Sequence, residues 1–129
     1  TFIACGQMVN IAIKACQKLS ELGYSIRIIN MTSIKPIDTE IIKKAAKETN
    51  LIFTIEEHSI IGGLGSAVCE VICENYPTRV IRIGINDLFG LSGSAESLLN
   101  HYNLTSVNLV KTFLKCKKKD SSAIRSAYS

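Results

Sequence analysis

The chain has 129 residues, of which 47% are hydrophobic and 20% charged, and its formal net charge is +4. This length predicts one domain, and this apolar fraction excludes disorder for most of the chain. Residues 1–114 carry ten Lys or Arg against ten Asp or Glu, so the whole excess of positive charge lies in residues 115–129. The neutral body disfavours a nucleic-acid-binding domain, which needs a basic folded face. No apolar run approaches the ~18 residues of a membrane helix, so we expect no membrane partner.

The chain contains five cysteines, which are Cys5, Cys16, Cys69, Cys73 and Cys116. An odd number without regular spacing argues against a disulfide framework and indicates a reducing compartment, so we expect a cytoplasmic protein. Cys69 and Cys73 share a helix face, but no second pair of ligands accompanies them, and we expect no metal site.

Strand-like apolar runs alternate with segments of helical spacing. We expect strands at residues 2–5, 25–30, 51–55 and 79–83, and helices at 8–22, 39–49, 66–75, about 95–99 and from 106 onward. Asp38 and Thr105 are the expected N-caps of the second and the last helix. In the last helix we expect the inner side to consist of Val107, Val110, Phe113 and Leu114.

The alternation of strands and helices predicts an α/β sandwich with a largely parallel central sheet. We expect a single domain over residues 1–114. Residues 115–129 are rich in Lys and Ser and lack an apolar period, which predicts a basic, mobile tail.

A glycine-rich turn at residues 62–65 directly precedes the third expected helix. Gly63 and Gly65 begin a G-x-G-x-x-G pattern, but Val68 stands at its third glycine position and the turn follows the third strand, which disfavours a dinucleotide site. Two interpretations stay open. The helix start binds an anion, or the glycines allow a tight turn and close helix–strand packing, which we favour.

Glu57 and His58 end the third expected strand, at the edge where parallel sheets bind ligands. They could act as a base and its orienting group, but neighbouring strand residues point to opposite faces, so a packed interface histidine is the favoured interpretation. No complete catalytic set is present. The candidate interface or anion-binding residues are Glu57, His58, Gly62, Gly63, Gly65 and Ser66.

Four segments, in order, resemble the transketolase C-terminal domain. The same domain is also the C-terminal domain of 1-deoxyxylulose-5-phosphate synthases and of the beta chains of 2-oxoacid dehydrogenases. The segment at residues 54–68, TIEEHSIIGGLGSAV, resembles its signature stretch. Residues 31–38 (MTSIKPID), 83–93 (IGINDLFGLSG) and 95–105 resemble its strand-to-helix link, its Asp-x-Phe-Gly-x-Ser-Gly loop and its closing helices. The resemblance covers about residues 2–114.

The resemblance implies a three-layer domain with a mixed, mostly parallel sheet of about five strands, one edge strand running against the rest. It also implies that thiamine diphosphate and Mg²⁺ bind in other domains, through a Gly-Asp-Gly motif that this chain lacks. The glutamate that activates the cofactor belongs to the middle domain, so neither Glu56 nor Glu57 receives that role. We therefore expect no catalytic, cofactor-binding or metal-binding residue in this chain.

The implied function is that of a C-terminal domain or subunit of a transketolase, a transferase that moves two-carbon ketol units between sugar phosphates in the pentose phosphate pathway. Such a chain would be inactive alone and would contact the cofactor-binding domains or an N-terminal subunit within a homodimeric enzyme. The Glu-Glu-His-Ser form at residues 56–59 is most similar to bacterial transketolases split into two chains. The alternatives are the same domain of a 1-deoxyxylulose-5-phosphate synthase or a 2-oxoacid dehydrogenase beta chain, or a standalone anion-binding regulatory module.

Overall fold

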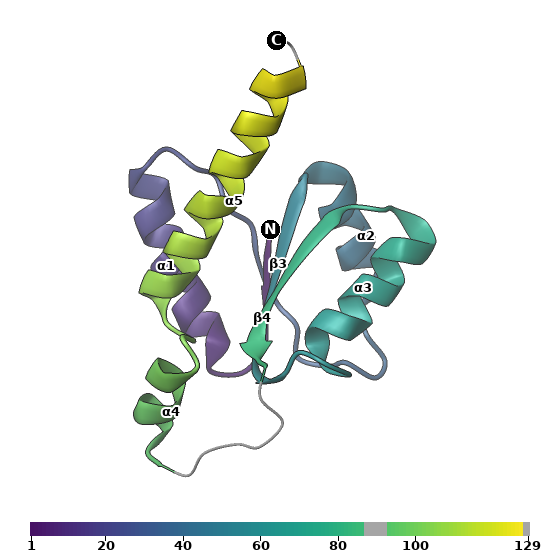
Figure 1. Cartoon of the computed structure of the whole chain (residues 1–129). Coiled ribbons are helices and arrows are strands. Elements are labelled where there is room, and N and C mark those ends of the chain that lie inside the picture. Colours follow the sequence, from purple (N-terminus) through teal and green to yellow (C-terminus); the bar gives the residue numbers. More distant parts are fainter. Residues whose placement is uncertain (87–92, 128–129) are drawn as a thin grey trace.

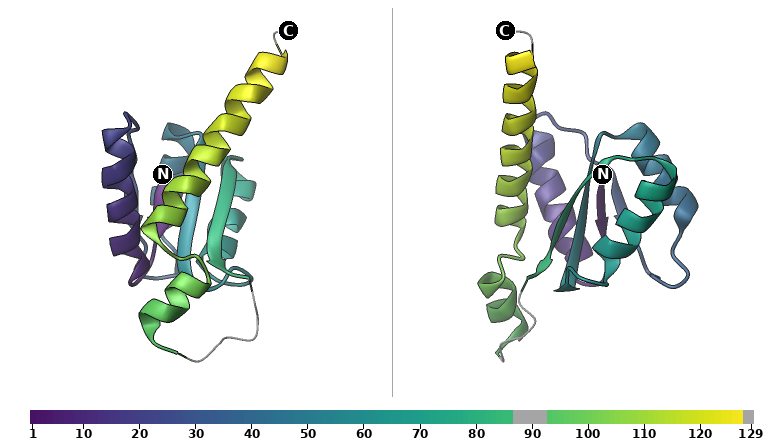
Figure 2. Two further views of the ribbon diagram at one scale, coloured as in Figure 1. Left: turned by 60° about the vertical axis from the view of Figure 1, so that its left-hand side comes forward. Right: turned by 45° about the vertical axis from the view of Figure 1, so that its right-hand side comes forward.

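A computed structural model describes residues 1–86 and 93–127 and has one parallel sheet with helices on both faces (Figure 1). The elements in chain order are β1 (Phe2–Ala4), α1 (Met8–Glu21), β2 (Ile28–Asn30), α2 (Thr39–Glu48), β3 (Leu51–Ser59), α3 (Leu64–Asn75), β4 (Arg79–Ile85), α4 (Ala95–His101) and α5 (Ser106–Ala127). Helices α1 and α5 cover one face of the sheet, and α2 and α3 cover the other (Figures 1 and 2). The predicted α/β sandwich is confirmed.

The strand order is β2-β1-β3-β4, and every strand pairing in the described part of the chain is parallel. Phe2 of β1 is in register with Ile28 on one side and with Phe53 on the other, so β1 lies inside the sheet. The spacing of apolar residues predicts these four strands. The fifth, antiparallel edge strand rested on the resemblance alone, and residues 1–86 and 93–127 do not contain it.

The sheet separates two apolar cores because side chains of each strand alternate between its faces. Under α1 and α5, Phe2 and Phe53 meet edge to face with ring centroids 5.3 Å apart, and Phe113 of α5 lies 5.8 Å from Phe53. Under α2 and α3, the core is built from Ile3, Ile42, Ile52 and other fully buried aliphatic side chains. Aromatic contacts of this geometry add to the stability gained from burial.

Both predicted N-caps are confirmed. The Ile41 amide donates to the Asp38 carboxylate at 3.1 Å, and the Asn108 amide donates to the Thr105 hydroxyl at 3.2 Å. Each side chain satisfies one of the N–H groups that a helix start leaves without a partner.

Helix α5 differs most from its prediction because it continues through Ala127, beyond the expected boundary at residue 114. Cys116 is buried, and Arg79 donates to the Asp120 carboxylate at 2.7 Å, which ties this part of the helix to β4. Val107, expected on the inner side, is 63% exposed. The buried stripe instead runs through Leu109, Phe113 and Cys116, whose spacing of four and three residues is that of one helix face. The mobility of residues 115–129 remains a prediction.

No helix in the described ranges combines the length and the apolar character required to cross a lipid bilayer.

Phe113 should be the residue by which α5 contributes most to stability. The change Phe113→Ala removes a ring that is 4% exposed and packs against Phe2, Tyr24 and Phe53, so we expect a loss of about 3–5 kcal/mol in the free energy of unfolding. Urea unfolding followed by circular dichroism measures this loss. Val107→Ala on the same helix is the control and should change stability by less than about 0.5 kcal/mol, since surface substitutions rarely do more. Equal losses for both variants would contradict the observed packing of α5.

Candidate functional site

The end of β3 and the start of α3 are joined by a buried carboxylate. The Glu56 side chain is 1% exposed, and its two oxygens accept hydrogen bonds from the Leu64 amide at 2.9 Å and the Gly65 amide at 2.8 Å. The first amides of a helix have no partner within the helix, and the helix dipole places partial positive charge there. Glu56 therefore supplies both hydrogen bonds and a compensating charge, and α3 begins at Leu64, two residues earlier than predicted.

The close approach of Glu56 explains why glycines stand in this turn. A Cβ atom on Gly63 would lie 2.0 Å from Glu56 Oε1, and one on Gly65 would lie 2.8 Å from the Thr54 hydroxyl and 2.9 Å from Arg82 Cδ. Gly62 has a φ of +77°, a left-handed conformation that side chains with a Cβ rarely adopt. These three positions support the favoured interpretation of a tight turn with close helix–strand packing.

Further hydrogen bonds hold the turn at residues 59–63, which we call the β3–α3 turn. The Ile60 carbonyl accepts from Arg82 Nη1 at 2.8 Å and from the Ser66 hydroxyl at 3.1 Å. The Gly62 amide donates to the Ser66 hydroxyl at 2.9 Å, and the Ile61 amide donates to the Ser59 hydroxyl at 3.2 Å. The backbone of the turn is thus fixed from several sides while the Ile61 side chain, 71% exposed, projects into solvent.

The remaining predicted site residues lie on the same edge of the sheet but do not form a catalytic pair. Glu57 is half-buried and His58 is exposed, as expected for neighbouring strand residues that point to opposite faces. The structure shows no hydrogen bond or ion pair between these two side chains within its described residues. The arrangement gives no support to a base with its orienting group, and an interface role for Glu57 and His58 remains a prediction.

The interpretation of an anion-binding helix start meets a physical obstacle. The amides of Leu64 and Gly65, two of the groups that would bind a phosphate, already bind Glu56. A ligand anion would have to displace a buried carboxylate from its hydrogen bonds. Anion binding by Gly62, Gly63, Gly65 and Ser66 therefore remains a prediction, and the geometry favours the alternative.

Sequence reasoning missed Thr54 and Arg82 and did not assign a structural role to Glu56. Residues 51–56 are all buried on one face or the other, so the alternation of the strand gives no clear signal that Glu56 points toward the helix that follows. The Thr54 hydroxyl is buried and has no hydrogen-bond partner. Nothing in the sequence indicates that Arg82 reaches across to the Ile60 carbonyl.

The comparison with protein families decides among the interpretations of this fold. A family model described as "Transketolase, C-terminal domain" matches residues 1–109. The chain belongs to this family. The signature stretch that carried the resemblance, residues 54–68, is the segment that contains Glu56 and the whole β3–α3 turn. The Asp-x-Phe-Gly-x-Ser-Gly segment, in contrast, falls mainly on residues 87–92, outside the described residues.

Relatives of this transketolase C-terminal domain include chains named as a section or a subunit of a transketolase. The chain is 47% identical to the "Putative transketolase C-terminal section" of Methanocaldococcus jannaschii, over 93% of this chain and 37% of that protein. It is 44% identical to a protein of Phocaeicola vulgatus named as a subunit of apulose-4-phosphate transketolase, over 92% of this chain and 38% of that protein. It is also 40% identical to a 1-deoxy-D-xylulose-5-phosphate synthase of Heliobacterium modesticaldum, over 86% of this chain and 17% of that protein.

A solved structure titled "Split gene transketolase, inactive beta4 tetramer" has the same fold, with a TM-score of 0.83 and 43% sequence identity. The match covers 88% of this chain and 37% of that chain. The chain thus spans less than two fifths of the length of the relatives and the structure named here.

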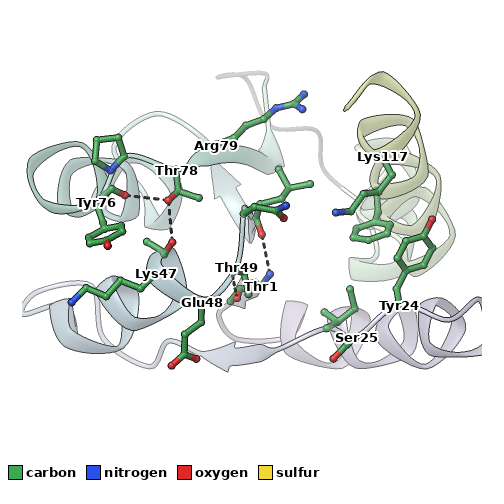
Figure 3. Close-up of a pocket in the computed structure, with 16 residues that line it drawn as sticks. Thr1, Tyr24, Ser25, Lys47, Glu48, Thr49, Tyr76, Thr78, Arg79 and Lys117 are labelled. Carbon is green, nitrogen blue, oxygen red and sulfur yellow. Dashed lines mark hydrogen bonds between the residues drawn. The ribbon is translucent and has the colours of Figure 1, made fainter. Parts of the chain in front are cut away.

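The transketolase C-terminal domain also has a hollow of about 750 Å³ at the opposite, amino-terminal edge of the sheet (Figure 3). Its lining includes three cationic side chains, but each already has a partner. Arg79 binds Asp120, Lys47 lies over the Tyr76 ring, and Lys117 lies over the Phe113 ring. Each of these cationic side chains therefore already interacts with another residue of the chain.

The described residues do not fit thiamine diphosphate or Mg²⁺. The amides at the start of α3 that could bind a diphosphate are taken by Glu56. In residues 1–86 and 93–127 no group of three or more His, Cys, Asp or Glu side chains is placed to hold a metal ion. Mg²⁺ prefers an octahedral set of oxygen ligands that includes carboxylates or phosphates. We therefore derive no chemical step through these groups in this chain.

Gly63→Ala tests the fit of the β3–α3 turn. The added methyl group must push the Glu56 carboxylate away from the α3 amides, so we expect a loss of about 2–3 kcal/mol, which is typical of an overpacked buried site. Gly93→Ala is the matched control because, among the described residues, its Cβ would meet no atom closer than 4.0 Å. Thermal and urea unfolding of both variants measure the difference. Unchanged stability of Gly63→Ala would overturn the assigned packing.

The thiol of Cys5, at the end of β1, should react slowly. Burial raises its pKa first, and the nearby Glu56 charge raises it further. A higher pKa leaves a smaller fraction of reactive thiolate at neutral pH. We expect iodoacetamide at pH 7.5 to label the exposed Cys73 well before Cys5, and the labelling rate of Cys5 to keep rising with pH beyond the ordinary range of a thiol. Mass spectrometry of tryptic peptides over a pH series measures both rates. Equal rates at pH 7.5 would contradict the assigned environment.

Proposed function

We propose that this chain is the C-terminal part of a transketolase-type enzyme, a transferase that moves two-carbon ketol units between sugar phosphates. The observation that carries the proposal is the family match over residues 1–109, together with relatives named as transketolase sections and subunits. Thiamine diphosphate and Mg²⁺ belong to other domains or to a partner subunit in this proposal. The chain spans 37% of its relative from Methanocaldococcus jannaschii, which leaves ample length for those parts.

The role of this chain in the enzyme is to form contacts with the cofactor-binding part. The β3–α3 turn suits this role because its backbone is held by Glu56, Ser66 and Arg82 before any partner binds. A rigid turn loses little conformational entropy on binding, so the burial of Ile61 contributes more fully to affinity. Glu57 and His58 beside it would form the polar rim that surrounds the apolar centre of most interfaces.

The sugar phosphate itself is left open because the relatives differ in substrate. They include subunits named for apulose 4-phosphate and for 6-deoxy-6-sulfo-D-fructose, besides 1-deoxy-D-xylulose-5-phosphate synthases. The proposal therefore names the class of substrate, and the pentose phosphate pathway is one place for such a reaction. Five free cysteines support a reducing compartment such as the cytoplasm. The complete enzyme is proposed to be a homodimer of the assembled parts.

Reconstitution tests the proposal. The chain alone should show no ketol transfer and no saturable binding of thiamine diphosphate at micromolar concentration. Mixing it with the remaining parts of the enzyme from the same genome, which are the part that carries the Gly-Asp-Gly motif and the middle domain with the activating glutamate, should form a complex and restore transfer between sugar phosphates. Isothermal titration calorimetry and a coupled transketolase assay measure the two effects. Saturable cofactor binding by the chain alone, or no activity in a stable complex, would refute the proposal.

Ile61→Asp tests the proposed contact within that complex. Placing a charge on an interface centre leaves it buried and unpaired, so we expect affinity for the partner to fall at least tenfold. The free chain should keep its melting temperature because Ile61 is 71% exposed. Ile124→Asp is the control, since Ile124 is 59% exposed but lies near the far end of α5. A complex that tolerates Ile61→Asp as well as Ile124→Asp would place the contact elsewhere.

A further inference from the structure

Within residues 1–86 and 93–127, strand β4 has a free edge. It pairs with β3 on one side, and on its other side the described part of the chain supplies no strand (Figure 1). The Ile85 carbonyl accepts from the Ile60 amide on the β3 side. Because the polar groups of successive strand residues point to opposite edges, the amides and carbonyls of Val80, Arg82 and Gly84 point outward. Such a row of backbone donors and acceptors can pair with another strand.

The residues of β4 itself carry few of the usual protections of an edge strand. Its sequence, RVIRIGI over residues 79–85, contains no proline, lysine or acidic residue. The irregularity in this pair of strands lies in β3, between Ile55 and Ser59. The two arginines are held by their own chain, Arg79 by Asp120 and Arg82 by the Ile60 carbonyl. Charged side chains at an edge strand commonly prevent its pairing with another strand. Here both arginine side chains are bound to groups of their own chain instead.

The strand is complementary to itself in an antiparallel register centred on Ile83. When two copies meet around a twofold axis at Ile83, Ile81 faces Ile85 of the other copy and Arg82 faces Gly84, where no side chain competes for space. In this register the outward amides of Arg82 and Gly84 face each other, as hydrogen-bonded pairs require. Moving the axis to Arg82 would set two arginines directly opposite, which is unfavourable. The half-buried Ile81, Ile83 and Ile85 also retain apolar surface to bury against the other copy.

We propose that β4 binds β4 of a second copy of this chain, antiparallel and centred on Ile83, so that one sheet continues through both copies. We assign another copy of the chain to this edge because the antiparallel pairing places isoleucines opposite isoleucines. It also places Arg82 opposite Gly84, which has no side chain. This surface is separate from the β3–α3 turn. It joins like chains, whereas the turn contacts the cofactor-binding part, so either can fail without the other.

Register-specific cross-linking tests the proposal. Ile83 faces itself across the axis in a non-hydrogen-bonded pair, in which Cα atoms lie about 4.5 Å apart, within the range of a disulfide. In a Cys73→Ser background, which removes the exposed native thiol, Ile83→Cys should give a covalent dimer when diamide oxidises the two thiols and is itself reduced to the hydrazine. Ile81→Cys alone should give little dimer, but Ile81→Cys mixed with Ile85→Cys should give a heterodimer. The parent chain is the control on a non-reducing gel.

Two outcomes overturn the proposal. The first is the absence of the Ile83→Cys dimer, or a dimer from Ile81→Cys alone in equal yield, either of which excludes this register. The second is a monomer at 100 µM in sedimentation equilibrium of the unchanged chain, which should instead show a reversible dimer. The sedimentation measurement also decides the matter should Ile83→Cys fail to fold under reducing conditions. Ile83→Lys should abolish the dimer by opposing two charges, whereas Val107→Lys, with the same added charge on exposed α5, should leave it intact.

Discussion

The contact on which this structure depends is the pair of hydrogen bonds from the α3 amides to the Glu56 carboxylate. A buried carboxylate without partners would be strongly unfavourable, and a buried helix start without partners would leave its N–H groups unsatisfied. The hydrogen bonds between them give partners both to the carboxylate and to the N–H groups of the helix start. The carboxylate also sets how closely β3 and α3 approach, because its oxygens lie where a side chain at Gly63 would otherwise stand. The path of the chain at the carboxyl end of the sheet follows from this one contact.

The same contact gives the signature stretch, residues 54–68, a structural role in place of a ligand-binding one. A glycine-rich turn before a helix at the end of a parallel strand commonly binds phosphate. Here the anion is part of the chain, and the turn becomes a fixed element of the surface instead of a ligand site. Arg82 and Ser66 add to this by holding the Ile60 carbonyl from two directions. What the turn presents outward is an apolar side chain, which is suited to protein contacts.

The sequence is sufficient to predict the elements and their order because apolar spacing reports directly which faces are buried. The strands around Phe2, Ile29, Phe53 and Ile81 and the cap at Asp38 follow from that pattern and from the chemistry of helix ends. The predictions differ from the structure where tertiary contacts outweigh the spacing of apolar residues. Lysines make α5 look solvated after residue 114, yet Cys116 and the pairing of Asp120 with Arg79 extend its contact with the body.

The candidate site was predictable in position but not in role. Sequence alone places Glu57, His58 and the glycines at the carboxyl edge of the sheet, and the structure finds them there. It does not reveal that Glu56 is the buried member of the three, because strand alternation could begin on either face at the irregular end of β3. The reach of Arg82 depends on the register of β4 against β3, which no local pattern encodes.

The position of β1 inside the sheet has a consequence for folding. Residues 2–4 pair with residues that lie much later in the chain, since Phe2 pairs with Ile28 and with Phe53. Contacts between residues distant in sequence slow folding because the intervening chain must be ordered before they form. During synthesis, β1 leaves the ribosome before β2 and β3, and its second edge stays unpaired until β3 has emerged. The helix α1, whose backbone hydrogen bonds are local, is free to form in that interval and to shield the apolar β1 until the sheet assembles around it.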